Sequence, residues 1–108
     1  MIRVLIADDH KLVRDGLKGI LGAASGIEVA GEAAGGDEAL AKVRAQAFDV
    51  VLLDLSMPGL SGIDLIKRLR LERPALRILV LSMHGEQQYA ARALKAGASG
   101  YLTKDAAA

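Results

Sequence analysis

The sequence contains no cysteine, which excludes a disulfide framework and thiolate chemistry. Its 14 basic and 13 acidic side chains leave a formal net charge of +1, so no general field attracts nucleic acid or an anionic membrane. The apolar run at the N-terminus is broken by charges after seven residues and is too short for a signal peptide or a membrane span. With 108 residues, 52% of them hydrophobic, we expect one soluble, globular, cytoplasmic domain.

Short apolar runs without period-2 alternation predict strands that are buried on both faces. Three such runs are strong, at 4–7, 50–53 and 78–81, and two are weaker, at 27–30 and 99–102. Between them lie helical stripes whose inward positions are predicted to be Val13, Leu17, Ile20, Leu21, Leu40, Val43, Ile63, Ile66, Leu69, Ala90, Ala93 and Leu94. Ser61 is a predicted N-cap of the third helix. This alternation predicts a doubly wound α/β fold with a five-stranded parallel sheet and helices on both faces.

Polar side chains follow the strands where each one ends. Asp8 and Asp9 follow the first strand, Asp54 the third, Ser82 the fourth and Lys104 the fifth. Ligands of doubly wound sheets bind beyond the carboxyl ends of the strands, so these groups should converge. Three acids and one lysine leave a net charge of −2, which a divalent cation would neutralise, and oxygen ligands select a hard cation such as Mg²⁺. Glycine-rich phosphate loops of the dinucleotide or P-loop type are absent from the sequence.

Asp54 is the candidate nucleophile, because an ionised carboxylate needs no general base and can accept a phosphoryl group as a covalent intermediate. The obstacle is repulsion between two anions, which positioning and charge neutralisation must overcome. Mg²⁺ on Asp8 or Asp9 would bridge one phosphoryl oxygen. Lys104 would neutralise a second oxygen, and the hydroxyl of Ser82 would donate a hydrogen bond to a third.

Four segments of the sequence, IADDH, LLDLSMPGLSG, VLSMH and GASGYLTK, resemble in order and spacing the receiver domain of two-component response regulators. The wording of ADDHKLVRDGL and LSMH is most similar to the subfamily that carries a LuxR/NarL-type helix-turn-helix DNA-binding domain C-terminally. The resemblance spans essentially the whole chain. It implies a flavodoxin-like (CheY-like) sheet with strand order 2-1-3-4-5 in a bacterial signalling protein.

The resemblance further implies phosphotransfer from a phosphohistidine of a sensor histidine kinase to Asp54. It implies that Mg²⁺ is held by Asp9, by Asp54, by the backbone carbonyl of Ser56 and, through water, by Asp8. The protein would then catalyse only its own phosphorylation and dephosphorylation, and would not be an enzyme acting on other substrates.

A switch is also implied by the resemblance. Ser82 would move toward the phosphoryl group and Tyr101 would turn inward, so that the face around the fourth helix and fifth strand changes partners. The result would be homodimerisation or release of an attached effector domain. Contact with DNA would occur only through that C-terminal domain, which this chain does not include, and no contact with a membrane is expected.

Two departures from the family pattern stand at the end of the chain. Asp105 follows Lys104 where family members often have a proline with a cis bond, and we expect a trans bond here because a non-proline cis bond costs about 3–4 kcal/mol. The sequence also ends at 105–108, where the fifth helix of the family should begin. A receiver domain cut at 1–108 should leave an apolar flank of the sheet bare, with weak stability, exchange of elements between chains, or association.

Taken singly, the same residues have simpler interpretations. Asp8 and Asp9 could be a helix-start pair favoured by the helix dipole, and Asp54 could form an Asx turn. His10 and His84 are expected to be partly exposed loop residues, because two lone histidines without a third ligand do not specify zinc. A solvated basic face is predicted for Arg68, Arg70, Arg73 and Arg77.

Two other functions remain open from the sequence. A Mg²⁺-dependent phosphatase of the haloacid dehalogenase type also uses a strand-end aspartate, but it needs a second aspartate where this chain has Ser56, and 108 residues leave no room for a cap. A phosphorylation-independent interaction module with the same fold is the other alternative.

Overall fold

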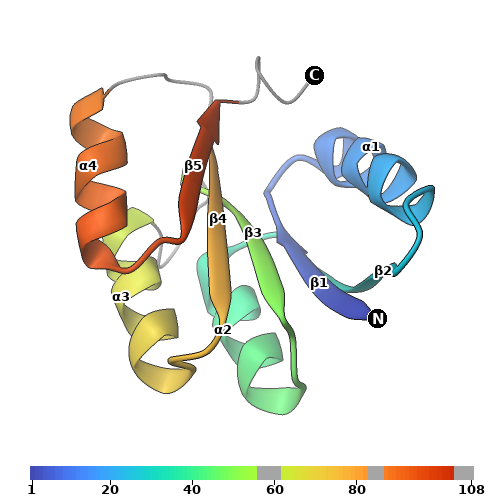
Figure 1. The fold of residues 1–108 in the computed structure, drawn as a ribbon, viewed down its shortest axis with the longest axis horizontal. Coiled ribbons are helices and arrows are strands. Elements are labelled where there is room, and N and C mark those ends of the chain that lie inside the picture. The colour runs from blue at the N-terminus through green and yellow to red at the C-terminus, as the bar shows by residue number, and fades with distance from the viewer. Residues whose placement is uncertain (56–61, 83–86, 104–108) are drawn as a thin grey trace.

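The computed structural model describes residues 1–55, 62–82 and 87–103, with side chains for all of these except 82, 87–89 and 103. Strands and helices alternate along the chain (Figure 1). In chain order they are β1 (Ile2–Ala7), α1 (Lys11–Gly22), β2 (Ile27–Ala33), α2 (Gly36–Ala45), β3 (Val50–Asp54), α3 (Gly62–Glu72), β4 (Arg77–Ser82), α4 (Gln87–Ala96) and β5 (Gly100–Thr103).

The strands form one parallel sheet in the order β2-β1-β3-β4-β5, as the resemblance implied. All four strand pairs are parallel, and a register shift between Val4 and Leu5 interrupts the β1–β2 pair. Because the strands are parallel, their carboxyl ends share one edge of the sheet. The predicted α/β class, the five strands and their order are confirmed.

The two faces of the sheet are covered unequally. Helices α2, α3 and α4 pack on one face, while α1 packs on the other against β1 and β2 (Figure 1). The main core lies on the three-helix face, where α3 alone buries Leu65, Ile66 and Leu69 completely. On the α1 face, the buried cluster of the described residues consists of Val4, Ile6, Leu52 and Leu81. Helix α1 itself has no fully buried residue.

Some predicted inward positions are wrong. Ile20 of α1 and Leu94 of α4 are exposed, whereas Ile63 of α3 is half-buried against the main core and Leu65, which was not predicted, is fully buried. A surface helix buries only a narrow stripe of its side chains against the sheet, so an apolar residue at the margin of that stripe faces solvent. The strands β1 and β2 run longer than their apolar runs, because backbone pairing continues where side chains turn polar. The predicted N-cap Ser61 lies outside the described residues.

On the α1 face, the apolar side chains of β4 and β5 are covered to different degrees. Leu102 of β5 pairs in register with Leu81 and is 42% exposed, and Leu79 of β4 is half-buried. Leu81 belongs to the buried cluster against which Leu17 and Leu21 of α1 pack, and the predicted consequences of a bare flank stay predictions. No helix within 1–55, 62–82 and 87–103 has the length and apolar composition that crossing a bilayer requires.

Candidate metal and phosphoacceptor site

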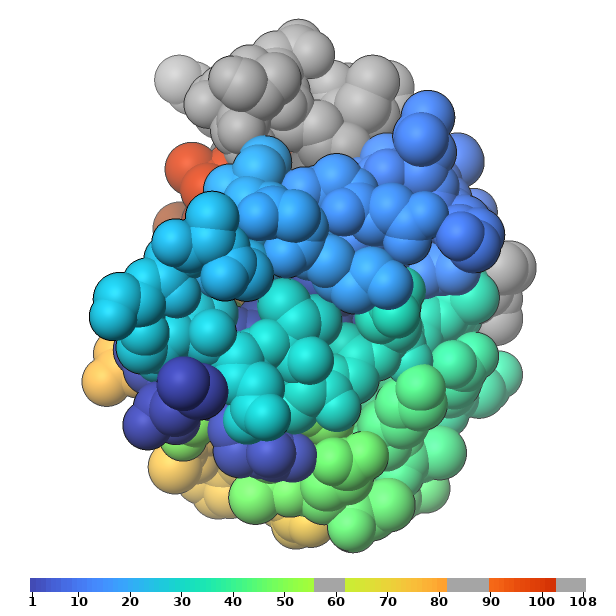
Figure 2. Space-filling model, turned by 90° about the vertical axis from the view of Figure 1, so that its right-hand side faces the viewer, coloured from blue at the N-terminus to red at the C-terminus, as the bar shows by residue number. Residues whose placement is uncertain are grey.

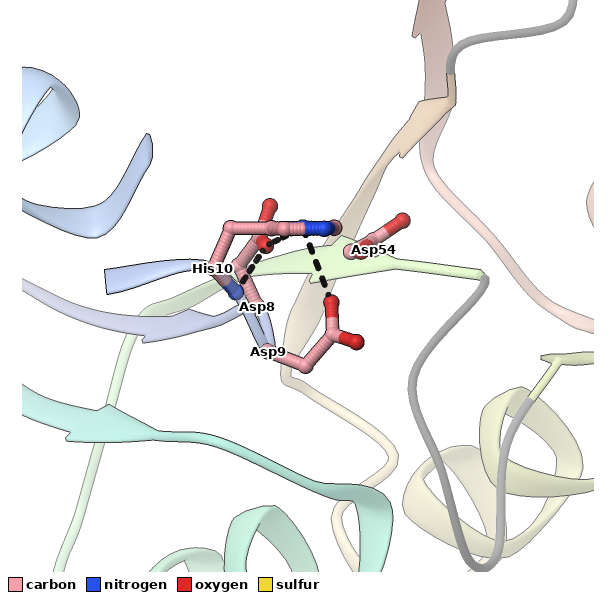
Figure 3. A group of neighbouring side chains, drawn as sticks. All are labelled: Asp8, Asp9, His10 and Asp54. Carbon is pink, nitrogen blue, oxygen red and sulfur yellow. Dashed lines mark hydrogen bonds and ion pairs between the residues drawn. The ribbon is translucent and has the colours of Figure 1, made fainter. Parts of the chain in front are cut away.

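Acidic side chains from two neighbouring strands meet at the carboxyl edge of the sheet (Figure 3). Asp54 is the last residue of β3, while Asp8 and Asp9 follow β1 directly. Asp8 and Asp54 are each 1% exposed. One carboxylate oxygen from each of the three aspartates, together with a ring nitrogen of His10, lies within 4.8 Å of the others. The convergence predicted for the three aspartates is therefore confirmed.

The backbone around Asp8 is fixed by hydrogen bonds on every side. Its N–H donates to the carbonyl of Ala33 at 3.0 Å, and its carbonyl accepts a bond from the guanidinium of Arg14 at 2.7 Å. Its side-chain Oδ1 accepts the backbone N–H of His10 at 2.9 Å, a local turn typical of aspartate. The carboxylate is thus positioned before any ligand binds.

A paired set of charges anchors this corner to α1. Figure 2 looks onto the β2 side of the molecule, where the band of α1 residues lies directly against β2. Arg14 Nε lies 3.1 Å and Lys18 Nζ 2.9 Å from the carboxylate of Glu32. The hydrogen bond from Lys18 holds the pKa of Glu32 below its ordinary value, with Arg14 adding to the shift and desolvation opposing it. Arg14 therefore links a structural ion pair to the carbonyl of Asp8.

Electrostatics indicate what kind of ligand the site can bind. Two unit charges 4.8 Å apart repel by about 3 kcal/mol at an effective dielectric constant of ~20. Clustered carboxylates are stable together when a cation neutralises them, and hard oxygen donors suit Mg²⁺, which accepts one or two carboxylates and keeps several waters. The donor set around Asp8, Asp9 and Asp54 therefore fits a divalent cation.

The remaining predicted site residues are only partly covered by the structure. Ser82 is the last residue of β4 and pairs in register with Thr103, so its backbone belongs to the same edge of the sheet. Tyr101 of β5 pairs with Val80, and its half-buried ring packs on the core of the three-helix face. Ser56, His84 and Lys104 lie outside the described residues, as does the bond between Lys104 and Asp105.

Two arginines with structural roles were missed or misjudged from the sequence. Arg14 was not singled out, although an arginine one turn into the helix after an acidic pair is the available signal. Arg70 was predicted to be solvated but is half-buried. Its guanidinium donates to the carbonyls of Gly97 at 2.7 Å, Pro74 at 2.7 Å and Leu76 at 2.5 Å.

A parallel sheet in the order 2-1-3-4-5 with a partly buried acidic cluster at its carboxyl edge defines a doubly wound, CheY-like fold. The chain belongs to the response regulator receiver domain family, whose model matches residues 4–108. It is therefore a receiver domain of the two-component response regulators.

Similar proteins agree on the subfamily. The chain is 45% identical over 107 residues to the response regulator UvrY of Escherichia coli O6:H1, covering 99% of this chain and 49% of UvrY. A LuxR-family response regulator from Aurantimonas sp. SI85-9A1 superposes with a TM-score of 0.90 at 39% identity, covering 94% of this chain and 73% of that one. The receiver domain of RcsB from Salmonella enterica, solved with the phosphomimetic BeF₃⁻, gives a TM-score of 0.91 at 31% identity, covering 96% and 78%. The chain spans about half the length of the curated relatives it matches.

Proposed function

We propose that Asp54 accepts a phosphoryl group from the phosphohistidine of a sensor histidine kinase. The observation that supports this is the gathering of three carboxylates from two strand ends within 4.8 Å, with Asp54 buried at the end of its strand. A buried, pre-positioned carboxylate attacks phosphorus without losing a flexible side chain's entropy. Mg²⁺ bound at the site would supply the charge neutralisation that lets an anion approach a phosphoryl group.

Each residue of the site has a proposed role. The proposed metal ligands are Asp9, Asp54, the backbone carbonyl of Ser56 and, through water, Asp8. The hydroxyl of Ser82 donates a hydrogen bond to one phosphoryl oxygen, and the ammonium of Lys104 neutralises the charge of another. The domain would catalyse only its own phosphorylation and dephosphorylation. We propose that it does so in the bacterial cytoplasm.

We further propose that phosphorylation changes the partners of the α4–β5 face. Ser82 ends β4 and the half-buried Tyr101 lies on β5, so both belong to elements bordering α4. A local change of charge at the strand ends would bias their position and favour a homodimer or release of an effector domain. The double length of the UvrY relative and the LuxR family of a solved neighbour support a C-terminal helix-turn-helix domain as that effector.

Incubation with acetyl phosphate and Mg²⁺, followed by intact-mass measurement, tests the assignment. The wild-type chain should gain one phosphoryl mass, located on Asp54 by peptide mapping, and Asp54→Asn should gain none. Asp64→Asn, the same change at an exposed aspartate in the first turn of α3, is the matched control and should still be phosphorylated. Sustained hydrolysis of varied phosphate esters would instead indicate a phosphatase, and absence of any adduct would indicate a phosphorylation-independent module.

A further inference from the structure

The imidazole of His10 lies inside the acidic cluster. Its Nδ1 is 3.0 Å from Oδ1 of Asp9 and 3.2 Å from Oδ1 of Asp8. Figure 3 shows the ring of His10 extending toward Asp54, with the carboxylate of Asp9 pointing toward the same ring. A nitrogen donor therefore shares one small space with the carboxylates proposed to hold the cation.

The backbone fixes His10 in this place. His10 is the N-cap of α1, in extended conformation with φ −100° and ψ 111°. Its N–H donates to the carboxylate of Asp8 at 2.9 Å, and its carbonyl accepts the N–H of Arg14 at 3.1 Å. Only the two side-chain torsions remain free, so the ring reaches the cluster at small entropic cost.

A nitrogen ligand changes which cations a site prefers. An all-oxygen site favours hard cations such as Mg²⁺, whereas imidazole nitrogen favours Co²⁺, Ni²⁺ and Zn²⁺. The neutral ring carries one hydrogen, and when that hydrogen is on Nε2 the lone pair of Nδ1 is free to bind a metal. The side chain is 61% exposed, so water can accept the Nε2 hydrogen.

We propose that His10 is an additional ligand of the site for divalent transition metals and gives it a preference for them over Mg²⁺. The inference rests on the metal site of the proposed function and concerns its selectivity. A purely structural His10, which only donates a hydrogen bond to Asp8 or Asp9, would affect all cations equally. The ligand role and the structural role of His10 therefore predict different ratios of the Co²⁺ affinity to the Mg²⁺ affinity.

Calorimetric titration with Co²⁺ alone and with Mg²⁺ alone measures that ratio. His10→Asn keeps a side-chain N–H for the carboxylates but removes the imidazole, and it should reduce the preference for Co²⁺ by about tenfold or more. His84→Asn, at the only other histidine of the sequence, is the matched control and should leave the preference within about twofold.

Three results with the histidine variants would overturn the inference. These are an equal loss of affinity for both cations in His10→Asn, an unchanged preference in that variant, and a loss of preference in His84→Asn. Asp9→Asn should weaken the binding of both cations. If Co²⁺ binding survived this change, Co²⁺ would bind elsewhere in the chain and the inference would also be wrong. The acetyl phosphate assay is independent of these titrations: an absent adduct with a preserved His10 effect refutes the proposed function and leaves the metal selectivity intact.

Discussion

The two edges of the sheet use charge in opposite ways. At the amino edge, the charged groups have partners within the fold: the guanidinium of Arg3 lies 3.3 Å from the carboxylate of Glu28, and the carboxylate of Asp49 accepts the backbone N–H of Arg3 at 2.8 Å. The Arg3 guanidinium also lies over the Phe48 ring, 5.8 Å from its centroid. At the carboxyl edge, by contrast, the negatively charged carboxylates of Asp8, Asp9 and Asp54 lie close to one another.

This difference separates stability from function within one small fold. Charges with internal partners hold elements together and need nothing from outside. Like charges held close together oppose folding, and such groups are typical of sites that await a ligand. Removing a charge should therefore lower the free energy of unfolding at the amino edge and raise it at the carboxyl edge. The expected effects are given from the largest to the smallest.

Mg²⁺ should stabilise the wild-type chain through its carboxyl edge. At a free Mg²⁺ concentration about 100 times the Kd, the free energy of unfolding should rise by about 2.7 kcal/mol, because the cation binds the folded state. Asp9→Asn should lose most of this gain. Urea unfolding with Mg²⁺ and with a chelator measures both, and equal gains in the two proteins would show that Mg²⁺ acts elsewhere.

Arg70→Met should destabilise the amino edge by about 2 kcal/mol, because the carbonyls of Gly97, Pro74 and Leu76 lose a charged donor. Urea unfolding measures the change. Arg73→Met is the matched control, since Arg73 is exposed and its bonds are long, at 3.2 and 3.5 Å, and it should change stability by less than about 0.5 kcal/mol. Phosphorylation by acetyl phosphate should persist in both variants, and its loss in Arg70→Met would contradict the separation of the two edges.

The sequence predicts the sheet and the acidic cluster because both follow from local patterns. Buried parallel strands need continuous apolar runs, and the rule that strand ends meet at one edge places Asp8, Asp9 and Asp54 together without knowledge of any contact. Strand β2 was predicted too short because its second half, around Glu32, is polar and is held by backbone pairing to β1.

The residues that the sequence could not place depend on long-range contacts. Arg70 bonds to Gly97, 27 positions away, and nothing near Arg70 in the chain distinguishes it from its solvated neighbours. For His10, the local turn to Asp8 could be anticipated, but the direction of the ring depends on its χ torsions and on the carboxylates around it. Exposure of Leu94 depends on which margin of α4 meets the neighbouring elements.

Asp9→Asn should raise the free energy of unfolding in metal-free buffer by about 1 kcal/mol, because it removes one of the crowded negative charges. The side chain of Asp9 is 29% exposed, so solvent screening reduces the repulsion that it relieves.

Asp37→Asn is the matched control for this change. Asp37 is an exposed residue in the first turn of α2, where a negative charge interacts favourably with the helix dipole. Its substitution should lower stability by a few tenths of a kcal/mol. A loss of stability in Asp9→Asn would mean that the contact of Asp9 with His10 outweighs the repulsion among the carboxylates.

The smallest expected effect concerns Glu32, a paired acid close to the crowded ones. Because its hydrogen bond from Lys18 lowers the pKa of Glu32 from the ordinary value of 4.5, the ionised pair stabilises the fold above about pH 4.5. That contribution is lost as the pH falls through the lowered pKa of the folded state. The same pairing raises the pKa of Lys18 above 10.5, so the contribution is also lost as the pH rises through that raised value.

Glu32→Gln should therefore have a lower urea midpoint than the wild-type chain at neutral pH, and the two midpoints should converge in acid. High salt should narrow the difference at neutral pH, since the pair is partly exposed. Glu38→Gln, which loses a looser pair with Lys42 at 3.5 Å, is the control and should shift the midpoint less. A gap between wild type and Glu32→Gln that persists in acid would mean that Glu32 acts through packing and not through its charge, and that the anchor of Arg14 beside Asp8 does not depend on an ion pair.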